Sequence, residues 1–137
     1  MCATAVLVVM FGCTLAAPGS AAAVRASGPC TGQSENHIVQ VFYRRVAAYP
    51  LRCGNGISWG YLHILEGHEY EPLAITLTVA FGIPVPFTQA FILIAPVCPT
   101  KGFFVRYNQG SYGKHGVRPQ GIITAYEKAL PNVSQKC

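Results

Sequence analysis

Two histidines five positions apart, His63 and His68, stand in the run GYLHILEGH at residues 60–68. On a helix this spacing corresponds to about 140° of rotation, so the two side chains do not share a face as the zinc ligands of a metalloprotease helix do. An imidazole can hold or donate a proton near neutral pH, which makes either histidine a candidate general acid or base. The alternative is that both are ordinary surface or partly buried histidines.

The run GFFVRYN at residues 102–108 alternates in the way a strand does, so Phe104, Arg106 and Asn108 fall on one face. A guanidinium placed among aromatic and aliphatic neighbours could bind a phosphate through two parallel hydrogen bonds. Arg106 is therefore a candidate for stabilising negative charge. The alternative is an arginine at a sheet edge whose head group reaches solvent.

The run GIITAY at residues 121–126 predicts a further strand, with Thr124 and Tyr126 on the same face. A hydroxyl and a phenol two positions apart can both point at one substrate oxygen, and we include both residues among the candidate catalytic groups. The alternative is a last strand whose polar face meets only solvent.

A glycine-broken basic loop, SYGKHGVR at residues 111–118, lies between these two strands. Its phenol and cations, Tyr112, Lys114 and Arg118, suit a single strand of nucleic acid, which offers phosphates and bases that stack. The same composition is found in ordinary hairpin loops, so a role in substrate binding is a hypothesis.

The elements that would position these residues follow from periodicity. Ser34 is a good helix N-cap, and apolar residues at helical spacing predict a helix over residues 34–49, which Pro50 ends. A second, shorter helix is expected over residues 58–67. Candidate strands rich in β-branched and aromatic residues cover residues 74–81, 90–95, 102–107 and 121–126. The predicted class is α+β, with two N-terminal helices followed by a four- to five-stranded antiparallel sheet.

The N-terminal residues predict export. Residues 3–17 are uncharged and almost wholly apolar, and Ala21, Ala22 and Ala23 follow as a cleavage site for a signal peptidase. The run is too short for a membrane-spanning helix, so no stable span is expected in the mature chain. We predict a signal peptide over residues 1–23, a linker over residues 24–33 and a single domain over residues 34–137. The protein is expected to be secreted by a bacterium. Lipidation at Cys13 is the alternative.

Cleavage after residue 23 would leave four of the six cysteines, Cys30, Cys53, Cys98 and Cys137. In a short exported chain these most simply form two disulfides, for which three pairings are open. A zinc site is the competing interpretation, but the chain has no close pair of cysteines that would support it. We therefore expect a domain stapled by disulfides and no bound metal.

The formal net charge is +5, and every acidic residue is a glutamate. A basic domain of this kind suits an anionic partner such as nucleic acid, an anionic glycan or a membrane surface. Secreted proteins without a polyanionic ligand also carry such a charge.

Taken together, a helix with HILxGH, an arginine strand and a closing strand of the form GxITAY resemble the barnase/EndoU/colicin/RelE-like nuclease superfamily, most closely its toxin and phage-associated branches. The resemblance covers about residues 60–128. It implies an α+β fold, RNA as substrate and, because many such domains need no metal, no cofactor. It assigns His63, His68, Arg106, Thr124 and Tyr126 to the catalytic positions. Gly67 departs from the pattern, since an arginine is common there.

The sequence therefore favours a secreted, metal-independent ribonuclease, either free or acting as a toxin with a cognate immunity protein as partner. The first alternative is a non-catalytic exported binding module for a polyanion or a protein. The second is a cell-envelope hydrolase or inhibitor of unrelated fold.

Overall fold

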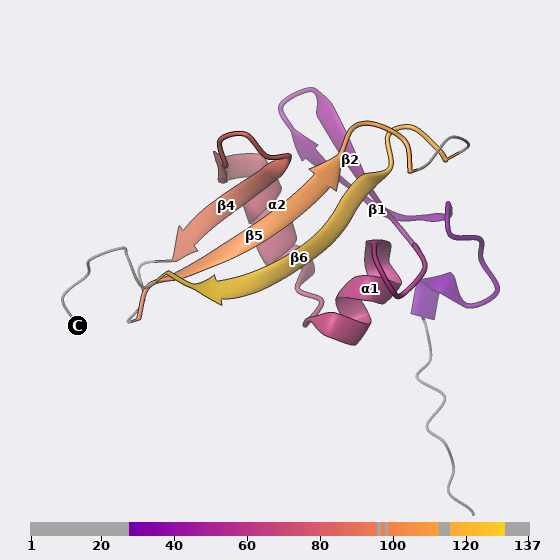
Figure 1. The fold of residues 1–137 in the computed structure, drawn as a ribbon, viewed down its shortest axis with the longest axis horizontal. Helices are drawn as coiled ribbons and strands as arrows, with labels where there is room; N and C mark the ends of the chain where they lie inside the picture. The colour runs from indigo at the N-terminus through magenta and orange to yellow at the C-terminus, as the bar shows by residue number, and fades with distance from the viewer. Residues whose placement is uncertain (1–27, 96, 98, 113–115, 131–137) are drawn as a thin grey trace, which may run out of the picture.

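The computed structural model describes residues 28–95, 97, 99–112 and 116–130 (Figure 1). The fold is mixed α+β. A hairpin comes first, and it is followed by two helices and then by a four-stranded antiparallel sheet in the order β3-β4-β5-β6. The elements are a 3-10 turn at Gly28–Cys30, then β1 (Ile38–Arg44), β2 (Ala47–Arg52), α1 (Gly60–Gly67), α2 (Pro72–Phe81), β3 (Ile83–Pro84), β4 (Ala90–Ala95), β5 (Lys101–Asn108) and β6 (Gly121–Ala129).

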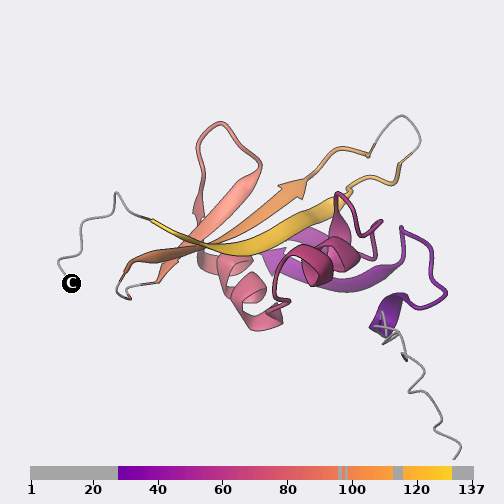
Figure 2. The same cartoon turned by 60° about the horizontal axis from the view of Figure 1, so that its bottom comes forward.

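Both helices lie on one side of the four-stranded sheet (Figure 2). Three residues that pair across β4, β5 and β6, Phe91, Val105 and Ala125, are almost fully buried and belong to the same hydrophobic core as Ile75 and Val79 of α2. This burial fixes which face of β5 and β6 is turned away from the helices, because neighbouring residues of a strand point to opposite faces. That other face carries Arg106 and Thr124.

The antiparallel sheet and the strands over residues 90–95, 102–107 and 121–126 agree with the prediction, and α1 lies within the helix predicted for residues 58–67. The helix predicted over residues 34–49 is wrong. This segment forms the β1–β2 hairpin, in which Arg44 pairs with Ala47 around a two-residue turn and Arg45 adopts a positive φ of 53°. The first of the two predicted N-terminal helices is thus replaced by a hairpin, which precedes α1 and α2.

The strand predicted over residues 74–81 is also wrong, because this segment is helix α2. Its buried residues are Ile75, Thr78 and Val79, a spacing of three and four that belongs to one face of a helix. Pro72 occupies the first turn, where its missing N–H costs nothing. The β-branched composition suggested a strand, but burial at helical spacing decided the conformation.

Arg44 ties the hairpin to the end of α2. Its Nη1 atom lies 3.0 Å from the carbonyl oxygen of Val79, 3.2 Å from that of Ala80 and 3.0 Å from that of Gly82. The guanidinium also lies 4.7 Å from the centroid of the Phe91 ring. These contacts satisfy carbonyl groups that have no partner within the helix.

We expect Arg44→Met, which keeps the apolar stem and removes the guanidinium, to lower the free energy of unfolding by about 2–3 kcal/mol. Arg45→Met is the matched control, because Arg45 is exposed at the hairpin turn, and it should stay within about 0.5 kcal/mol of the wild type. Urea denaturation followed by circular dichroism measures both. Equal effects of the two substitutions would show that these carbonyl contacts do not stabilise the fold.

A disulfide joins Cys30 to Cys53, which are 23 positions apart. Both cysteines are buried, and the bond holds the residues before β1 against the end of β2. The other predicted disulfide cysteines, Cys98 and Cys137, lie outside the described residues, as does the predicted signal peptide. Within the described part of the chain, no helix has the length and apolar character needed to cross a membrane.

The start of β6 passes close to β2. Gly121 has a φ of +92°, and a Cβ atom at this position would lie 1.9 Å from the carbonyl oxygen of Pro50. Only glycine permits both the left-handed backbone conformation and the close approach of this backbone to the carbonyl oxygen of Pro50. The contact fixes the origin of the strand that carries Thr124 and Tyr126.

Candidate functional site

The pairing of β5 with β6 brings three candidate side chains and Phe104 together on the face of the sheet away from the helices. Arg106 lies opposite Thr124, and Phe104 lies opposite Tyr126. Residues directly opposite each other in an antiparallel pair have their side chains on the same face and in contact range. A bulge after Arg106 shifts the register at this point, so Ile123 is the extra residue of β6.

The two histidines reach this group from the end of α1. The ring centroids of His68 and Tyr126 are 5.3 Å apart, and the ring planes are inclined by 30°. The ring of Phe104 stacks on that of Tyr126, with 5.4 Å between the centroids and 11° between the planes. His63 meets His68 edge to face, with 6.0 Å between the ring centroids. The rings therefore form a continuous row from the helix end onto the sheet face.

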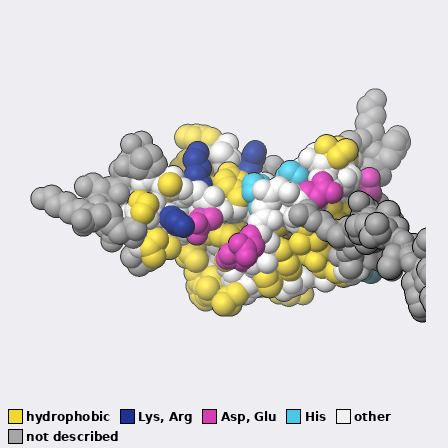
Figure 3. Space-filling view, turned by 90° about the horizontal axis from the view of Figure 1, so that it is seen from below, with side chains coloured by type: hydrophobic (Ala, Val, Ile, Leu, Met, Phe, Trp, Pro, Cys, Tyr) yellow, Lys and Arg dark blue, Asp and Glu magenta, His cyan; other side chains and the backbone are white. Residues whose placement is uncertain are grey.

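The position of His68 follows from how α1 ends. His68 is the C-cap residue, and its backbone N–H donates to the carbonyl of Ile64 at 2.8 Å while its own backbone is extended. This geometry turns the chain out of the helix beside β6. His68 is exposed and His63 is half-buried, and the underside of the molecule presents neighbouring histidine side chains (Figure 3).

Two small clefts meet at Tyr126. One, of about 230 Å³, is lined by His68 and Tyr126 together with Glu69, Glu71, Phe103 and Glu127. The other, of about 210 Å³, is lined by Tyr126, Phe104 and Arg106 together with Val85, Thr88 and Ala90. The carboxylates thus line the cleft with His68, whereas the arginine lines the other cleft that Tyr126 shares.

Thr124 is 8% exposed, and among the described residues its Oγ1 has no hydrogen-bond partner. A buried hydroxyl without a partner costs free energy, so such a group calls for an explanation. Thr124 lies opposite Arg106 and two positions from Tyr126, but its hydroxyl oxygen is buried and Thr124 lines none of the clefts that Arg106 and Tyr126 line.

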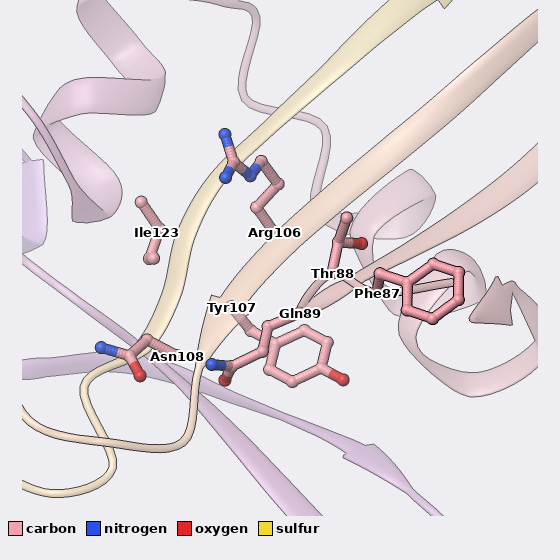
Figure 4. Close-up of a pocket in the computed structure, with 7 residues that line it drawn as sticks. All are labelled: Phe87, Thr88, Gln89, Arg106, Tyr107, Asn108 and Ile123. Carbon is pink, nitrogen blue, oxygen red and sulfur yellow. The ribbon is translucent and has the colours of Figure 1, made fainter. Parts of the chain in front are cut away.

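A larger cleft, of about 620 Å³, continues from Arg106 along the sheet (Figure 4). Its lining residues are Phe87, Thr88, Gln89, Arg106, Tyr107, Asn108 and Ile123. Tyr107 packs into the core, where burial raises the pKa of its phenol, the nearby Tyr49 raises it further and Arg44 opposes the shift. Tyr107 is therefore a neutral wall of the cleft.

Of the described residues of the basic loop, Tyr112 and Arg118 line none of these three clefts. Tyr112 packs against the buried Trp59, with 5.7 Å between the ring centroids, and Arg118 is exposed. Lys114 lies outside the described residues. The role of these three residues in substrate binding stays a prediction.

In the described ranges, no group of three or more histidine, cysteine or acidic side chains is arranged to hold a metal ion. Among the described residues, the one ion pair joins Lys101 Nζ to Glu127 Oε1 at 2.6 Å. No carboxylate of the described residues therefore neutralises the guanidinium of Arg106. Arg106 is also exposed. It is therefore available to an anionic ligand.

Sequence reasoning missed several residues of the site. The strand repeat puts Phe104 on the face of Arg106 but predicts no role for it, although it stacks on Tyr126. Glu69 directly follows His68 and Glu71 comes two positions later, and this closeness in sequence is the signal that could have identified them. Nothing in the sequence marks Phe87 or Gln89, because a turn before β4 brings them to the cleft.

Comparison of the chain with protein-family models, with curated protein sequences and with solved structures finds no match. The geometry of the site and the short motifs that place residues in it are therefore the basis for proposing a function.

Proposed function

We propose that this protein is an exported ribonuclease that cleaves RNA by attack of the 2′-hydroxyl on the adjacent phosphorus, without a metal ion. The observation that supports the proposal best is the row of groups around Tyr126. The ring of His68 packs beside the phenol ring of Tyr126, and Arg106 lines a cleft that the same phenol lines.

Cleavage of RNA in this way needs a base, an acid and a group that stabilises charge. His68 or His63 takes the proton from the 2′-oxygen as that oxygen bonds to phosphorus. The bond from phosphorus to the 5′-oxygen then breaks, and the other histidine or Tyr126 protonates the leaving oxygen. The products are a 2′,3′-cyclic phosphate and a free 5′-hydroxyl.

Arg106 stabilises the negative charge that grows on the phosphate oxygens during the attack. Its guanidinium can contact two of these oxygens at once. The carboxylates of Glu69 and Glu71 repel phosphate from the cleft that contains His68, whereas Glu127 is paired with Lys101. A phosphate is thereby directed to the cleft that Arg106 lines.

Export is part of the same proposal. The signal-like residues 1–23 and the Cys30–Cys53 disulfide are both suited to an oxidising compartment. A ribonuclease released from the cell would act as a toxin toward competitors, and the producing cell would then need an immunity protein that covers the site.

The direct test is cleavage of a labelled RNA by the purified, oxidised protein in EDTA. We expect products with 2′,3′-cyclic phosphate ends and no cleavage of single-stranded DNA of the same sequence, because DNA lacks the attacking hydroxyl. If the folded protein leaves RNA intact, the ribonuclease proposal is wrong and a binding module becomes the better interpretation. If cleavage appears only after Mg²⁺ is added, the metal-independent mechanism is wrong.

A further inference from the structure

Phe87 is the most exposed large apolar side chain of the described residues, at 107% of its reference area, and it stands at one end of the 620 Å³ cleft. An exposed aromatic ring beside a polar cleft costs solubility and contributes nothing to the core. Its place at the mouth of a cleft therefore suggests a role in binding.

The turn that presents Phe87 is held by internal hydrogen bonds. Phe87 has a φ of +60°, an uncommon conformation for a bulky residue that occurs where the surroundings impose it. Thr88 Oγ1 donates to the carbonyl of Val85 at 2.9 Å, and Val85 N–H donates to the carbonyl of Ala90 at 3.0 Å. The ring is thus presented on an ordered turn, so little conformational entropy is lost when a ligand binds it.

The polar residues of the cleft offer hydrogen-bond donors. The Gln89 side-chain oxygen accepts from the backbone N–H of Gln109 at 2.9 Å, and that of Asn108 accepts from Gly110 N–H at 2.8 Å. These two amides can therefore offer a ligand mainly N–H hydrogens, and Asn108 has one left to offer because its Nδ2 already donates to Gln120 Oε1 at 2.8 Å. Arg106 adds its guanidinium, and no carboxylate lines the cleft. The cleft suits a ligand rich in acceptor atoms and carrying a flat apolar face.

The same cleft adjoins the proposed catalytic group. Arg106 and Thr88 line both the 620 Å³ cleft and the 210 Å³ cleft that contains Tyr126. In Figure 4, Arg106 projects at one side of the larger cleft, while Phe87 and Asn108 stand at its two ends. A chain whose phosphate contacts Arg106 would therefore place its neighbouring nucleotide in this cleft.

We propose that the Phe87 cleft is a nucleobase-binding subsite, in which a base next to the phosphate at Arg106 stacks on Phe87 and accepts hydrogen bonds from Gln89 and Asn108. This inference rests on the proposed ribonuclease function, because it takes a single-stranded nucleic acid as the ligand. Stacking on an aromatic ring contributes substantially to single-strand binding and tolerates different bases.

The experiment measures the affinity of the full protein for a short, fluorescently labelled single-stranded DNA. DNA lacks the attacking hydroxyl, so binding is observed without cleavage. We expect Phe87→Ala to weaken binding about 5- to 100-fold, and Phe87→Trp to keep the affinity near the wild-type value. Phe81→Ala is the matched control, because Phe81 is 74% exposed at the end of α2 and does not line the cleft, and it should leave the affinity unchanged.

A second probe isolates the base. The same strand with every base replaced by an abasic tetrahydrofuran unit keeps the phosphates but has nothing to stack. Phe87→Ala should leave the weaker binding of this probe unchanged, whereas Arg106→Gln should weaken both probes. An equal effect of Phe87→Ala on the two probes would overturn the subsite.

The outcomes separate this inference from the ribonuclease proposal. If the protein cleaves RNA and Phe87→Ala binds DNA as well as the wild type does, the subsite is wrong and the enzyme stands. If the protein cuts no RNA but binds DNA in a Phe87-dependent way, the subsite stands and the catalytic proposal fails. If the wild type does not bind the DNA at millimolar concentration, the subsite is wrong.

Discussion

Replacing His68 by alanine should lower the rate of RNA cleavage by about 10²–10⁴-fold, the usual effect of losing a positioned acid or base. His68 is the candidate that contacts Tyr126 directly, through rings 5.3 Å apart. It is exposed at the helix end, so its loss removes no core contact and should leave stability nearly unchanged. The measurement is kcat for a short RNA, with the melting temperature as a check on folding.

The control for His68→Ala is His37→Ala. His37 is also exposed but precedes β1 and lines none of the clefts around Tyr126, so this variant should cleave RNA at the wild-type rate. His63→Ala should fall below the wild type if the two histidines share the proton transfers. A bell-shaped pH–rate profile should lose one limb in a single-histidine variant. Activity that survives both substitutions would rule out general acid–base catalysis by these residues.

The site residues could be found from the sequence where a strand repeat alone decides the geometry. Arg106 and Asn108 line one cleft because a strand places alternate residues on one face. The same repeat puts Thr124 and Tyr126 together. What the sequence does not contain is the register, which sets Arg106 opposite Thr124 and depends on a bulge at Ile123.

The elements that were predicted wrongly carry patterns compatible with two structures. In residues 34–49, apolar side chains recur at spacings that fit a helix, and the turn at Arg45 lacks the glycine or asparagine that usually marks a hairpin. In α2, β-branched residues suggested a strand, whereas Ile75 and Val79 were already spaced four apart and Pro72 stood at the helix start. Long-range packing resolved both cases: Arg44 of the hairpin contacts the carbonyl groups at the end of α2.

The disulfide shows a different limit of sequence reasoning. Four cysteines allow three pairings, and only the fold shows that Cys30 and Cys53 lie 5.5 Å apart between their Cα atoms. The clefts likewise depend on elements distant in sequence, since Phe87 comes from the turn before β4 and Asn108 from the end of β5. A ligand site built from separate turns leaves no local motif.

Replacing Arg106 by glutamine should lower kcat for RNA cleavage by about 10²–10³-fold, because the guanidinium is the group proposed to stabilise charge in the transition state. Arg106 is exposed on the sheet face, and no carboxylate of the described residues pairs with it, so its loss should change the free energy of unfolding by less than about 0.5 kcal/mol. Arg106→Lys keeps the charge but cannot form two parallel hydrogen bonds, and it should recover only part of the rate.

Arg45→Gln separates a local role of Arg106 from a general effect of net charge. Both glutamine variants lose one positive charge, but Arg45 lies at the β1–β2 turn and lines none of the three clefts. Arg45→Gln should therefore keep kcat, and its binding to DNA should keep the wild-type dependence on salt. In Arg106→Gln the magnitude of the slope of log affinity against log salt concentration should fall by about one, as expected when one phosphate contact is lost. Equal losses in the two variants would mean that Arg106 acts only through the overall positive field, and the catalytic role assigned to it would be wrong.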